Sequence, residues 1–495
     1  MKKVVKSIFM SLLVLPLLVG IFGSATAYAD DAKVPVTLHK VIFNDEYPEG
    51  YPRQNTGKEM TDFGGEALPG AVFTVYDVTT QYHAAVENAD QATAQAAVIA
   101  AYTANPNSFT GLTSITTNEL GAATFNLPEK SGGLDAVYLF VETKTPGNVT
   151  VTQKAAPIVL ALPAYAFDAS TEKFTDEKLD HVHLYPKNIT SKDTKTVQNI
   201  DEFDMITEDG TRYNMERGQK IAFRLTLNIP SDIADVTYSV TDTPTDGLQF
   251  IADSLIANGL TAGSDYTITA NGDGGFTLAL NSNSATVQAL AGSTLIIDYQ
   301  MELTKDLVPD AIEGNKAIVK IGDIPQPEVT PKEKFQTGGK KIVKKDAHTD
   351  KTLAGAEFVV INQAGQYGEF ELNTAGTAYA LIGWVDVATS KSTLTSLADG
   401  SVNVIGLKYS KDGEEYTLNE TKAPSDKYVK IPDGTIKFKV EVRTYEEALT
   451  TVRNTPKGLL PSTGGSGIYI YLVIGAALML GAYSWFRKSK AQAEA

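Results

Sequence analysis

Two pairs of repeated segments constrain the fold of this chain more than any other feature. Residues 68–75 (Leu-Pro-Gly-Ala-Val-Phe-Thr-Val) recur as residues 353–360 (Leu-Ala-Gly-Ala-Glu-Phe-Val-Val). In the same order, residues 138–146 (Tyr-x-Phe-x-Glu-Thr-x-Thr-Pro) recur as residues 416–424 (Tyr-x-Leu-x-Glu-Thr-x-Ala-Pro). The chain therefore contains two copies of one domain design, and these copies flank a different region.

Short alternating segments rich in Thr, Val, Tyr and Gly, separated by turn residues, fill most of the sequence. This pattern is typical of β-sandwiches, and residues 220–227 and 295–303 are two clear strand-like runs. We therefore expect an all-β chain of tandem immunoglobulin-like sandwiches, and 495 residues suffice for about three domains. The Ala-rich residues 84–104 instead predict a helix, because alanine loses almost no side-chain entropy there. We interpret this stretch as a short helical insertion in the first sandwich.

Both ends of the chain carry targeting patterns. Three lysines (residues 2, 3 and 6) precede an apolar segment, and an Ala-x-Ala site ends at Ala29, which predicts a secretory signal peptide. Near the other end, the apolar residues 468–486 precede a short basic tail. At about 1.5 Å per residue, this run nearly spans a bilayer core of roughly 30 Å. The C-terminus is thus expected to hold the chain at a membrane with its tail in the cytoplasm.

The motif Leu460-Pro461-Ser462-Thr463-Gly464 stands just before this apolar run. A plain tail anchor leaves it unexplained, whereas the order of motif, apolar span and basic tail resembles the cell-wall sorting signal of Gram-positive surface proteins. The resemblance implies that a sortase cysteine cuts between Thr463 and Gly464 and keeps the threonyl carbonyl as a thioester.

The predicted parts of the chain are a signal peptide (1–29), an N-terminal domain (30–188), a middle domain (189–332), a C-terminal domain (333–457), the sorting motif (458–464), a transmembrane segment (465–486) and a basic tail (487–495).

Charge and cysteine content exclude some functions. The formal net charge is −16 at pH 7, which argues against nucleic acid as a partner. An exported chain without cysteine has no disulfides, so either its cores suffice or another cross-link stabilises it. Among the five histidines only His181 and His183 are close in sequence, and we interpret them as surface strand residues, not as metal ligands. We expect no metal and no cofactor, and no phosphate loop or catalytic triad order indicates an enzyme.

Three polar residues fall on apolar strand faces. Alternation along residues 34–42 places Lys40 on the same face as four apolar residues. A lysine in such a position usually extends its amine to water. However, Asn188 and Glu142 also align with apolar residues in their own segments. All three would then point into one core, where isolated polar groups are costly.

A reaction among these groups removes that cost. Burial lowers the pKa of an amine and raises that of a carboxyl, so neutral Lys40 can attack while protonated Glu142 polarises the carbonyl of Asn188. Loss of ammonia then leaves a lysine–asparagine isopeptide bond. This arrangement resembles the intramolecular cross-link of sortase-assembled pilins and of collagen-adhesin B-type domains.

The resemblance extends to the other two domains. In the C-terminal domain it implies Glu420 as the acid, Lys344 as the nucleophile and Asn454 as the acceptor, with Lys341 and Lys345 as alternative nucleophiles. In the middle domain it implies Lys195 as the nucleophile and Asp242 as the acid. The acceptor in the middle domain stays open between Asn315 and the segment that ends at Asp323. Whether this domain forms a bond at all is also open.

The tetrapeptide Tyr185-Pro186-Lys187-Asn188 indicates a second kind of cross-link. Alternation sends Lys187 away from Asn188, toward solvent, where alone it would be an ordinary solvated lysine. The tetrapeptide resembles the pilin motif of backbone pilins, whose lysine attacks the sortase thioester of the next subunit. The resemblance implies that Lys187 of one subunit joins Thr463 of another.

These resemblances together imply the major, backbone subunit of a covalent pilus on a Gram-positive surface. A class C sortase would join copies head to tail, and a housekeeping sortase would transfer the fibre to a peptidoglycan precursor. Ancillary pilins are further expected partners, and the sequence indicates no host ligand. The chain would be a substrate whose own chemistry is a single-turnover self-cross-link. The alternatives, an ancillary tip or basal pilin and a monomeric wall-anchored adhesin, would not need an acceptor lysine.

Overall fold

The computed structural model describes residues 32–51, 53–411, 413–458 and 467–493 of the chain. The predicted signal peptide and the residues of the sorting motif from 460 to 464 lie outside this part. The described chain forms two compact units. Unit 1 comprises residues up to 214, 219–304 and 312–336, and unit 2 comprises residues 215–218, 305–311 and those from 337 onward.

Strands contain 42% of the residues and helices 13%, which confirms the all-β prediction. Unit 1 contains two sets of strands, residues 33–190 (the N-terminal region) and residues 194–336 (the middle region). Among the described residues, no sheet joins strands of one region with strands of the other. The segment 334–336, which we expected in the C-terminal domain, pairs with residues 212–214 in unit 1.

The N-terminal region is a sandwich whose sheets follow the orders β14-β1-β6, β10-β15-β2-β3 and β11-β9-β4-β5. Its strands are β1 Lys33–His39, β2 Val41–Asn44, β3 Glu66–Ala67, β4 Val72–Asp77, β5 Gly111–Thr116, β6 Ala122–Pro128, β7 Lys130–Ser131, β8 Leu134–Asp135, β9 Val137–Lys144, β10 Val151–Gln153, β11 Ile158–Ala161, β12 Tyr165–Asp168, β13 Lys173–Lys178, β14 Val182–Leu184 and β15 Lys187–Thr190. Alternate residues of β1, β6 and β14 pack against those of β4 and β9 to form its main core.

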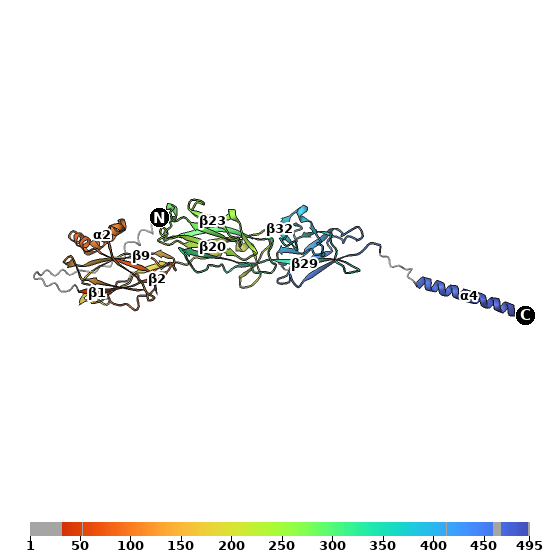
Figure 1. Cartoon of the computed structure of the whole chain (residues 1–495), viewed down its shortest axis with the longest axis horizontal. Coiled ribbons are helices and arrows are strands. Elements are labelled where there is room, and N and C mark those ends of the chain that lie inside the picture. The colour runs from red at the N-terminus through yellow and green to blue at the C-terminus, as the bar shows by residue number, and fades with distance from the viewer. Residues whose placement is uncertain (1–31, 52, 412, 459–466, 494–495) are drawn as a thin grey trace. The chain divides into compact units, whose positions relative to one another are not determined.

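The helical insertion consists of two helices, α1 (Thr79–Val86) and α2 (Gln91–Ala104), and not of the single helix predicted over residues 84–104. The chain breaks because Asp90 is extended and caps α2, its carboxylate accepting a hydrogen bond of 2.7 Å from the backbone of Thr93. Both helices pack on the outer face of the sheet that contains β9 (Figure 1).

The middle region contains two five-stranded sheets, with the orders β16-β19-β25-β21 (β22 also pairs with β25) and β23-β24-β20-β26-β27, and the small sheet β17-β18-β28. Its elements are β16 Thr194–Val197, β17 Asp204–Met205, β18 Arg212–Asn214, β19 Lys220–Asn228, β20 Tyr238–Pro244, β21 Leu248–Phe250, β22 Ile256–Ala257, β23 Tyr266–Ala270, β24 Phe276–Leu280, α3 Ala285–Gln288, β25 Thr294–Leu303, β26 Asn315–Ile321, β27 Ile324–Pro325 and β28 Lys334–Gln336. The two predicted strand-like runs are confirmed as β19 and β25, in which buried and less buried residues alternate.

Unit 2 is built on one sheet with the order β36-β35-β30-β31-β32-β34-β29-β37. Its strands are β29 Gly338–Asp346, β30 Glu357–Ile361, β31 Tyr367–Leu372, β32 Tyr379–Val385, β33 Leu394–Thr395, β34 Val404–Leu407, β35 Tyr416–Lys422, β36 Ile436–Phe438 and β37 Leu449–Asn454. The repeated segments occupy matching places. Glu142 on β9 pairs with Phe73 on β4, Glu420 on β35 pairs with Phe358 on β30, and a register shift lies beside each pair.

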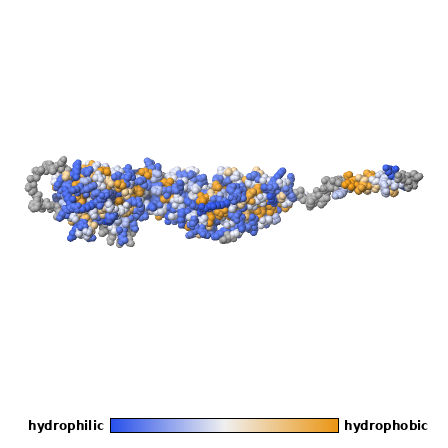
Figure 2. Space-filling model, turned by 90° about the horizontal axis from the view of Figure 1, so that it is seen from below, coloured by the Kyte–Doolittle hydropathy of each residue, from blue (hydrophilic) through white to orange (hydrophobic). Residues whose placement is uncertain are grey.

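The last described element is helix α4 (Gly467–Ala493). Figure 2 shows apolar residues along it, followed by hydrophilic ones. Within the described residues, no helix has an apolar stretch long enough to cross a membrane. The transmembrane segment predicted at residues 465–486 begins outside the described residues and is not confirmed.

Candidate cross-linking sites

The backbone of Lys40 is fixed at the break between β1 and β2. Its N–H donates to the carbonyl of Gly121 (2.7 Å), and its carbonyl accepts from the N–H of Leu68 (2.9 Å). Gly121 has φ +70°, and a Cβ there would lie 2.4 Å from the Lys40 carbonyl oxygen, so only glycine fits. Lys344 is held in the same way, by the carbonyl of Gly400 and the N–H of Leu353. The repeated leucine thus anchors a lysine in each copy.

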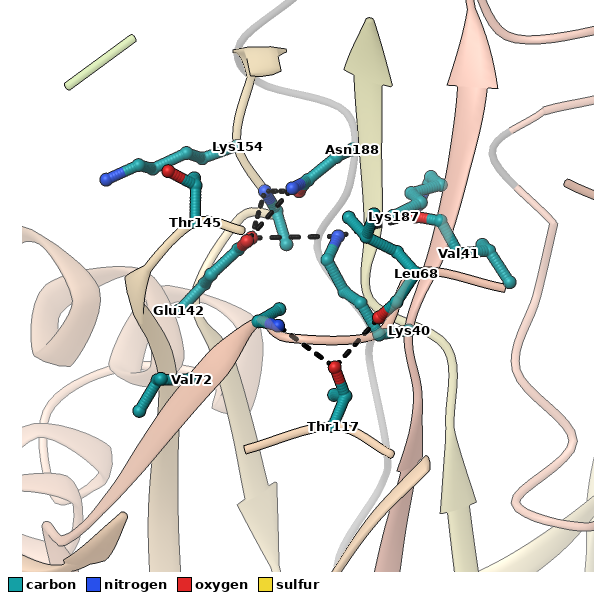
Figure 3. A network of polar contacts seen from close by, with 12 residues as sticks. Lys40, Val41, Leu68, Val72, Thr117, Glu142, Thr145, Lys154, Lys187 and Asn188 are labelled. Carbon is teal, nitrogen blue, oxygen red and sulfur yellow. Dashed lines mark hydrogen bonds and ion pairs between the residues drawn. The ribbon is translucent and has the colours of Figure 1, made fainter. Parts of the chain in front are cut away.

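The structure brings Lys40, Glu142 and Asn188 together in the N-terminal region (Figure 3). The Lys40 amine lies 3.6 Å from Glu142 Oε2, and both side chains are fully buried. The amide Nδ2 of Asn188 donates to Glu142 Oε1 at 2.9 Å. The Asn188 carbonyl oxygen instead accepts from the backbone N–H of Ala155 at 2.6 Å.

Glu142 contacts Asn188 at a different atom from the one expected. Its carboxyl lies against the amide nitrogen of Asn188, which would be the leaving group, and not against the carbonyl oxygen. The backbone N–H of Ala155 is the group that can polarise the carbonyl and stabilise a developing oxyanion. In the predicted reaction, Glu142 would be placed to protonate that nitrogen.

Burial tunes the nucleophile at this site. It lowers the pKa of Lys40 to about 7, although the nearby Glu142 carboxyl opposes the shift. A large share of the Lys40 side chains is therefore neutral near pH 7. A neutral amine has the free electron pair that attack on a carbonyl requires.

Unit 2 contains an equivalent site made of Lys344 on β29, Glu420 on β35 and Asn454 on β37. The Lys344 and Glu420 side chains are fully buried, and Asn454 Nδ2 donates to Glu420 Oε2 at 2.9 Å. Burial lowers the pKa of Lys344. Lys341 and Lys345, the alternative nucleophiles, are partly exposed and pair with carboxylates elsewhere. Lys344 is thus the lysine that the fold directs into the core.

Several polar atoms of this second site lack hydrogen-bond partners within the described residues. The Lys344 amine lies 3.0 Å from Glu420 Oε1, but the two atoms are not oriented for a hydrogen bond. The Asn454 carbonyl oxygen also has no partner. Buried polar atoms without partners are costly. A covalent bond between the amine and the amide carbon would consume the lysine amine and so remove part of this cost.

The middle region places Lys195, Asp242 and Asn315 at one site between its two large sheets. The Lys195 amine lies 2.5 Å from Asp242 Oδ2, and both side chains are fully buried. Burial lowers the pKa of Lys195 to about 8 and raises that of Asp242. Asn315 is also buried, whereas Asp323 is exposed. Of the two acceptors left open by the sequence, Asn315 is the one that reaches the site.

Tyr299 completes this middle site, although the sequence pattern had not singled it out. Its hydroxyl donates to Asp242 Oδ2 at 2.5 Å and accepts from Asn315 Nδ2 at 3.1 Å. The available signal was its position in the alternation of β25, which puts a tyrosine hydroxyl among apolar residues that face the core. A buried tyrosine hydroxyl usually has a hydrogen-bond partner.

Lys187 is less exposed than we expected. Its backbone pairs with Val41, and its side chain lies on the opposite side of β15 from Asn188 (Figure 3). The side chain is half-buried, and its amine lies 5.5 Å from the centre of the Tyr47 ring. This burial lowers the pKa of Lys187. The expectation of a fully solvated amine is therefore wrong, because the loop after β2 covers part of it.

The histidines also differ from the expectation. His39, distant in sequence, joins His183 through a hydrogen bond of 2.8 Å, and His183 stacks on His181. His181 is exposed, as expected of a surface residue, but His39 and His183 are half-buried. His39 also stacks on Tyr185. Among the described residues, no group of His, Cys, Asp and Glu side chains has the arrangement needed to hold a metal ion.

Three family models match the chain. Residues 31–189 match the Gram-positive pilin subunit D1, N-terminal domain, residues 338–455 match the prealbumin-like fold domain, and residues 453–494 match the LPXTG cell wall anchor motif. The first match contains the Lys40 and Lys187 sites, and the second contains the Lys344 site.

The chain is also similar to several known proteins. The chain is 26% identical to fimbrial subunit type 2 of Actinomyces naeslundii over 504 aligned positions, covering 90% of this chain and 87% of the relative. The RrgB pilus protein of Streptococcus pneumoniae has a similar fold, with a TM-score of 0.55, 16% identity and coverage of 88% and 100% of the two chains. The major pilin SpaD of Corynebacterium diphtheriae is 22% identical, with a TM-score of 0.42 and coverage of 86% and 98%.

The fold, the family matches and the anchor motif define a pilin of Gram-positive bacteria. More narrowly, the chain is a pilin of the sortase-assembled class that carries an LPXTG anchor and belongs to a wall-anchored surface pilus.

Proposed function

We propose that this pilin is the backbone subunit of its pilus and that Lys187 is the amine through which it polymerises. In the proposed reaction, a class C sortase cuts between Thr463 and Gly464 and transfers the Thr463 carbonyl to Lys187 of another copy. Repetition of this step joins copies head to tail, and such a contact need not close into a ring. A housekeeping sortase then transfers the fibre to a peptidoglycan precursor, and ancillary pilins join the same fibre.

The position of Lys187 is the observation that carries this proposal. It lies on the opposite side of β15 from the core residue Asn188, so its amine stays outside the internal cross-linking site. Partial burial lowers its pKa, which reduces the cost of forming the neutral amine that attacks a thioester. A fully solvated lysine has a pKa of about 10.4 and lacks this advantage.

The neighbouring Tyr185 is held in place from several sides. Its hydroxyl accepts a hydrogen bond of 2.5 Å from the backbone of Met60, and its ring stacks on Phe63 and His39. Tyr185 is itself buried, so it fixes the backbone two residues before the lysine and with it the position in which Lys187 is presented. This supports a motif-specific acceptor over use of any exposed lysine.

The proposal includes three internal isopeptide bonds, Lys40–Asn188, Lys195–Asn315 and Lys344–Asn454. Each would form once, without an external enzyme, with Glu142, Asp242 or Glu420 as the acid. Supporting this, each lysine is fully buried beside its acid, and burial lowers its pKa. The bonds would stabilise a chain that has no cysteine.

Polymerisation is tested by expressing the Lys187→Arg variant with the cognate sortases. Arginine keeps the charge but is not deprotonated to a nucleophile, so the ladder of covalent polymers in wall extracts should disappear. The matched control is Lys192→Arg, which changes a nearby exposed lysine just after the N-terminal region and should leave the ladder intact. A normal ladder from Lys187→Arg would overturn the proposed acceptor. Wild-type protein that reaches the wall only as a monomer would instead favour an adhesin, and incorporation without self-polymerisation would favour an ancillary pilin.

A further inference from the structure

The three internal sites differ in how the acid meets the leaving nitrogen. In the N-terminal region the Glu142 carboxylate directly accepts a hydrogen bond from Nδ2 of Asn188, at 2.9 Å. In unit 2, Glu420 accepts one from Nδ2 of Asn454, also at 2.9 Å. In the middle region the acid is an aspartate, which is one methylene shorter, and Nδ2 of Asn315 donates to the Tyr299 hydroxyl and to Met301 Sδ, each at 3.1 Å.

Tyr299 is well placed to connect the shorter acid with the leaving nitrogen. It comes from β25 in one sheet, whereas Asp242 and Asn315 come from β20 and β26 in the facing sheet. Its hydroxyl lies 2.5 Å from Asp242 Oδ2 and 3.1 Å from Asn315 Nδ2. Burial raises its pKa well above the ordinary value, so the hydroxyl keeps its proton and can donate it. A chain of hydrogen bonds therefore runs from the attacking amine to the leaving nitrogen.

Two buried oxygen atoms at this site bear on the protonation state of Asp242. Asp242 Oδ1 and Asn315 Oδ1 are buried acceptors, and neither has a hydrogen-bond partner among the described residues. A proton on the Asp242 carboxyl would relieve the burial of a charge, and burial does raise the pKa of Asp242. Proton transfer from Lys195 to Asp242 would produce this acid together with a neutral amine.

We propose that Tyr299 is a catalytic residue of the middle region, which relays a proton from Asp242 to the departing nitrogen of Asn315. The inference rests on the proposed Lys195–Asn315 bond. The neutral Lys195 amine attacks Cγ of Asn315, and the bond from Cγ to Nδ2 breaks. The attacking nitrogen gives one proton to Asp242, Asp242 passes a proton to Tyr299, and Tyr299 gives its own proton to Nδ2. The products are an amide and ammonia, and Asp242 and Tyr299 recover their starting protonation states.

The test measures ammonia loss separately in each region, by peptide mapping and mass spectrometry at successive times after expression of residues 30–463. In the Tyr299→Phe variant, the Lys195–Asn315 bond should form on the order of 100-fold more slowly or not at all. The bonds of the N-terminal region and of unit 2 serve as internal controls and should be complete. The matched control is Tyr238→Phe, which removes another buried hydroxyl of the middle region that does not contact the reacting groups.

A rescue experiment separates proton relay from packing. In the double variant Tyr299→Phe, Asp242→Glu the longer carboxyl can approach Asn315 Nδ2 directly, as Glu142 and Glu420 approach their asparagines. It should recover much of the lost rate, and the melting temperature of each variant shows whether the middle region has folded.

Three results would overturn the relay. The first is a wild-type rate in Tyr299→Phe, and the second is an equal loss of rate in Tyr238→Phe. The third is a folded double variant that forms the bond no faster than Tyr299→Phe. Wild-type protein that keeps its full mass in the middle region alone would refute the Lys195–Asn315 bond itself, and the relay with it. Full mass in all three regions would refute internal cross-linking altogether.

Discussion

Replacing Glu142 by glutamine should prevent the Lys40–Asn188 bond while preserving the shape of the site. Glutamine has nearly the same size and can still accept the hydrogen bond from Asn188 through its single amide oxygen, but it cannot supply the proton that the leaving nitrogen needs. The N-terminal region of the variant should therefore have the full mass of its own sequence, with no ammonia lost. The other two regions should keep their masses.

The loss of this bond has a calculable cost. Lys40 and Asn188 enclose nearly the whole N-terminal region, and closing a loop of about 150 residues is worth about 5 kcal/mol in the chain-entropy model. For a region of this size, 1 kcal/mol shifts the melting temperature by about 2–4 °C, so the expected decrease is roughly 10–20 °C. Calorimetry of residues 30–463, combined with mass spectrometry of each region, measures both effects.

A second variant separates the bond from the buried charge. Glu142→Gln leaves the Lys40 amine without its carboxylate partner, which adds a cost of its own. Lys40→Met also prevents the bond but removes the amine, so its melting temperature reports the loss of the cross-link more directly. If Glu142→Gln still loses ammonia, the acid is not required. If both variants lack the bond yet melt like the wild type, the entropic argument is wrong.

Two further predictions concern unit 2 and the histidine cluster. Lys344→Met should abolish ammonia loss in unit 2, whereas Lys341→Met should not, because only Lys344 is fully buried beside the acid. Mass spectrometry of both variants distinguishes them, and a reversed result would refute the assignment of the nucleophile. Burial lowers the pKa of His39 and His183 below 6.5, so the folded N-terminal region binds fewer protons than the unfolded chain and should lose stability as the pH falls below about 6.5. His39→Gln should reduce this loss of stability at low pH, whereas His348→Gln, at an exposed position, should not. The measurement is the melting temperature of each variant as a function of pH. Equal pH dependence in both variants would contradict the prediction.

Local sequence patterns were sufficient to single out the residues of one of the three internal sites. Alternation along a strand assigns each residue to a face, so Lys40, Glu142 and Asn188 stood out as polar residues on apolar faces. In unit 2 the repeated segment indicated Glu420, whereas Lys344 and Asn454 followed from the resemblance to cross-linked pilin domains. The predictions from alternation depend only on neighbouring residues, and strand breaks beside Lys40 and Pro186 did not change the faces.

The features that were missed depend on contacts between distant segments. The acceptor Asn315 could not be chosen from sequence, because its position follows from the register in which Pro244 on β20 pairs with it. Tyr299 comes from a different sheet, and Tyr47, which covers Lys187, comes from a loop about 140 residues earlier. His39 meets His183 only because β1 and β14 are parallel neighbours. Strand periodicity carries no information about such pairings.

The two kinds of proposed bond meet on neighbouring residues, and this adjacency has a mechanical consequence. Tension that enters a subunit through Lys187 reaches Asn188 after one residue, and Asn188 would be bonded to Lys40 at the start of β2. Tension that leaves through Thr463 passes Asn454, the last residue of β37, which would be bonded to Lys344. Within unit 2, force would therefore pass through the Lys344–Asn454 bond before it could separate the strands, and in the N-terminal region the Lys40–Asn188 bond would hold β15 beside β2 while β15 is pulled. Hydrogen bonds between strands contribute only about 0.5–1.5 kcal/mol each, so a covalent link at the point of entry is the more effective protection.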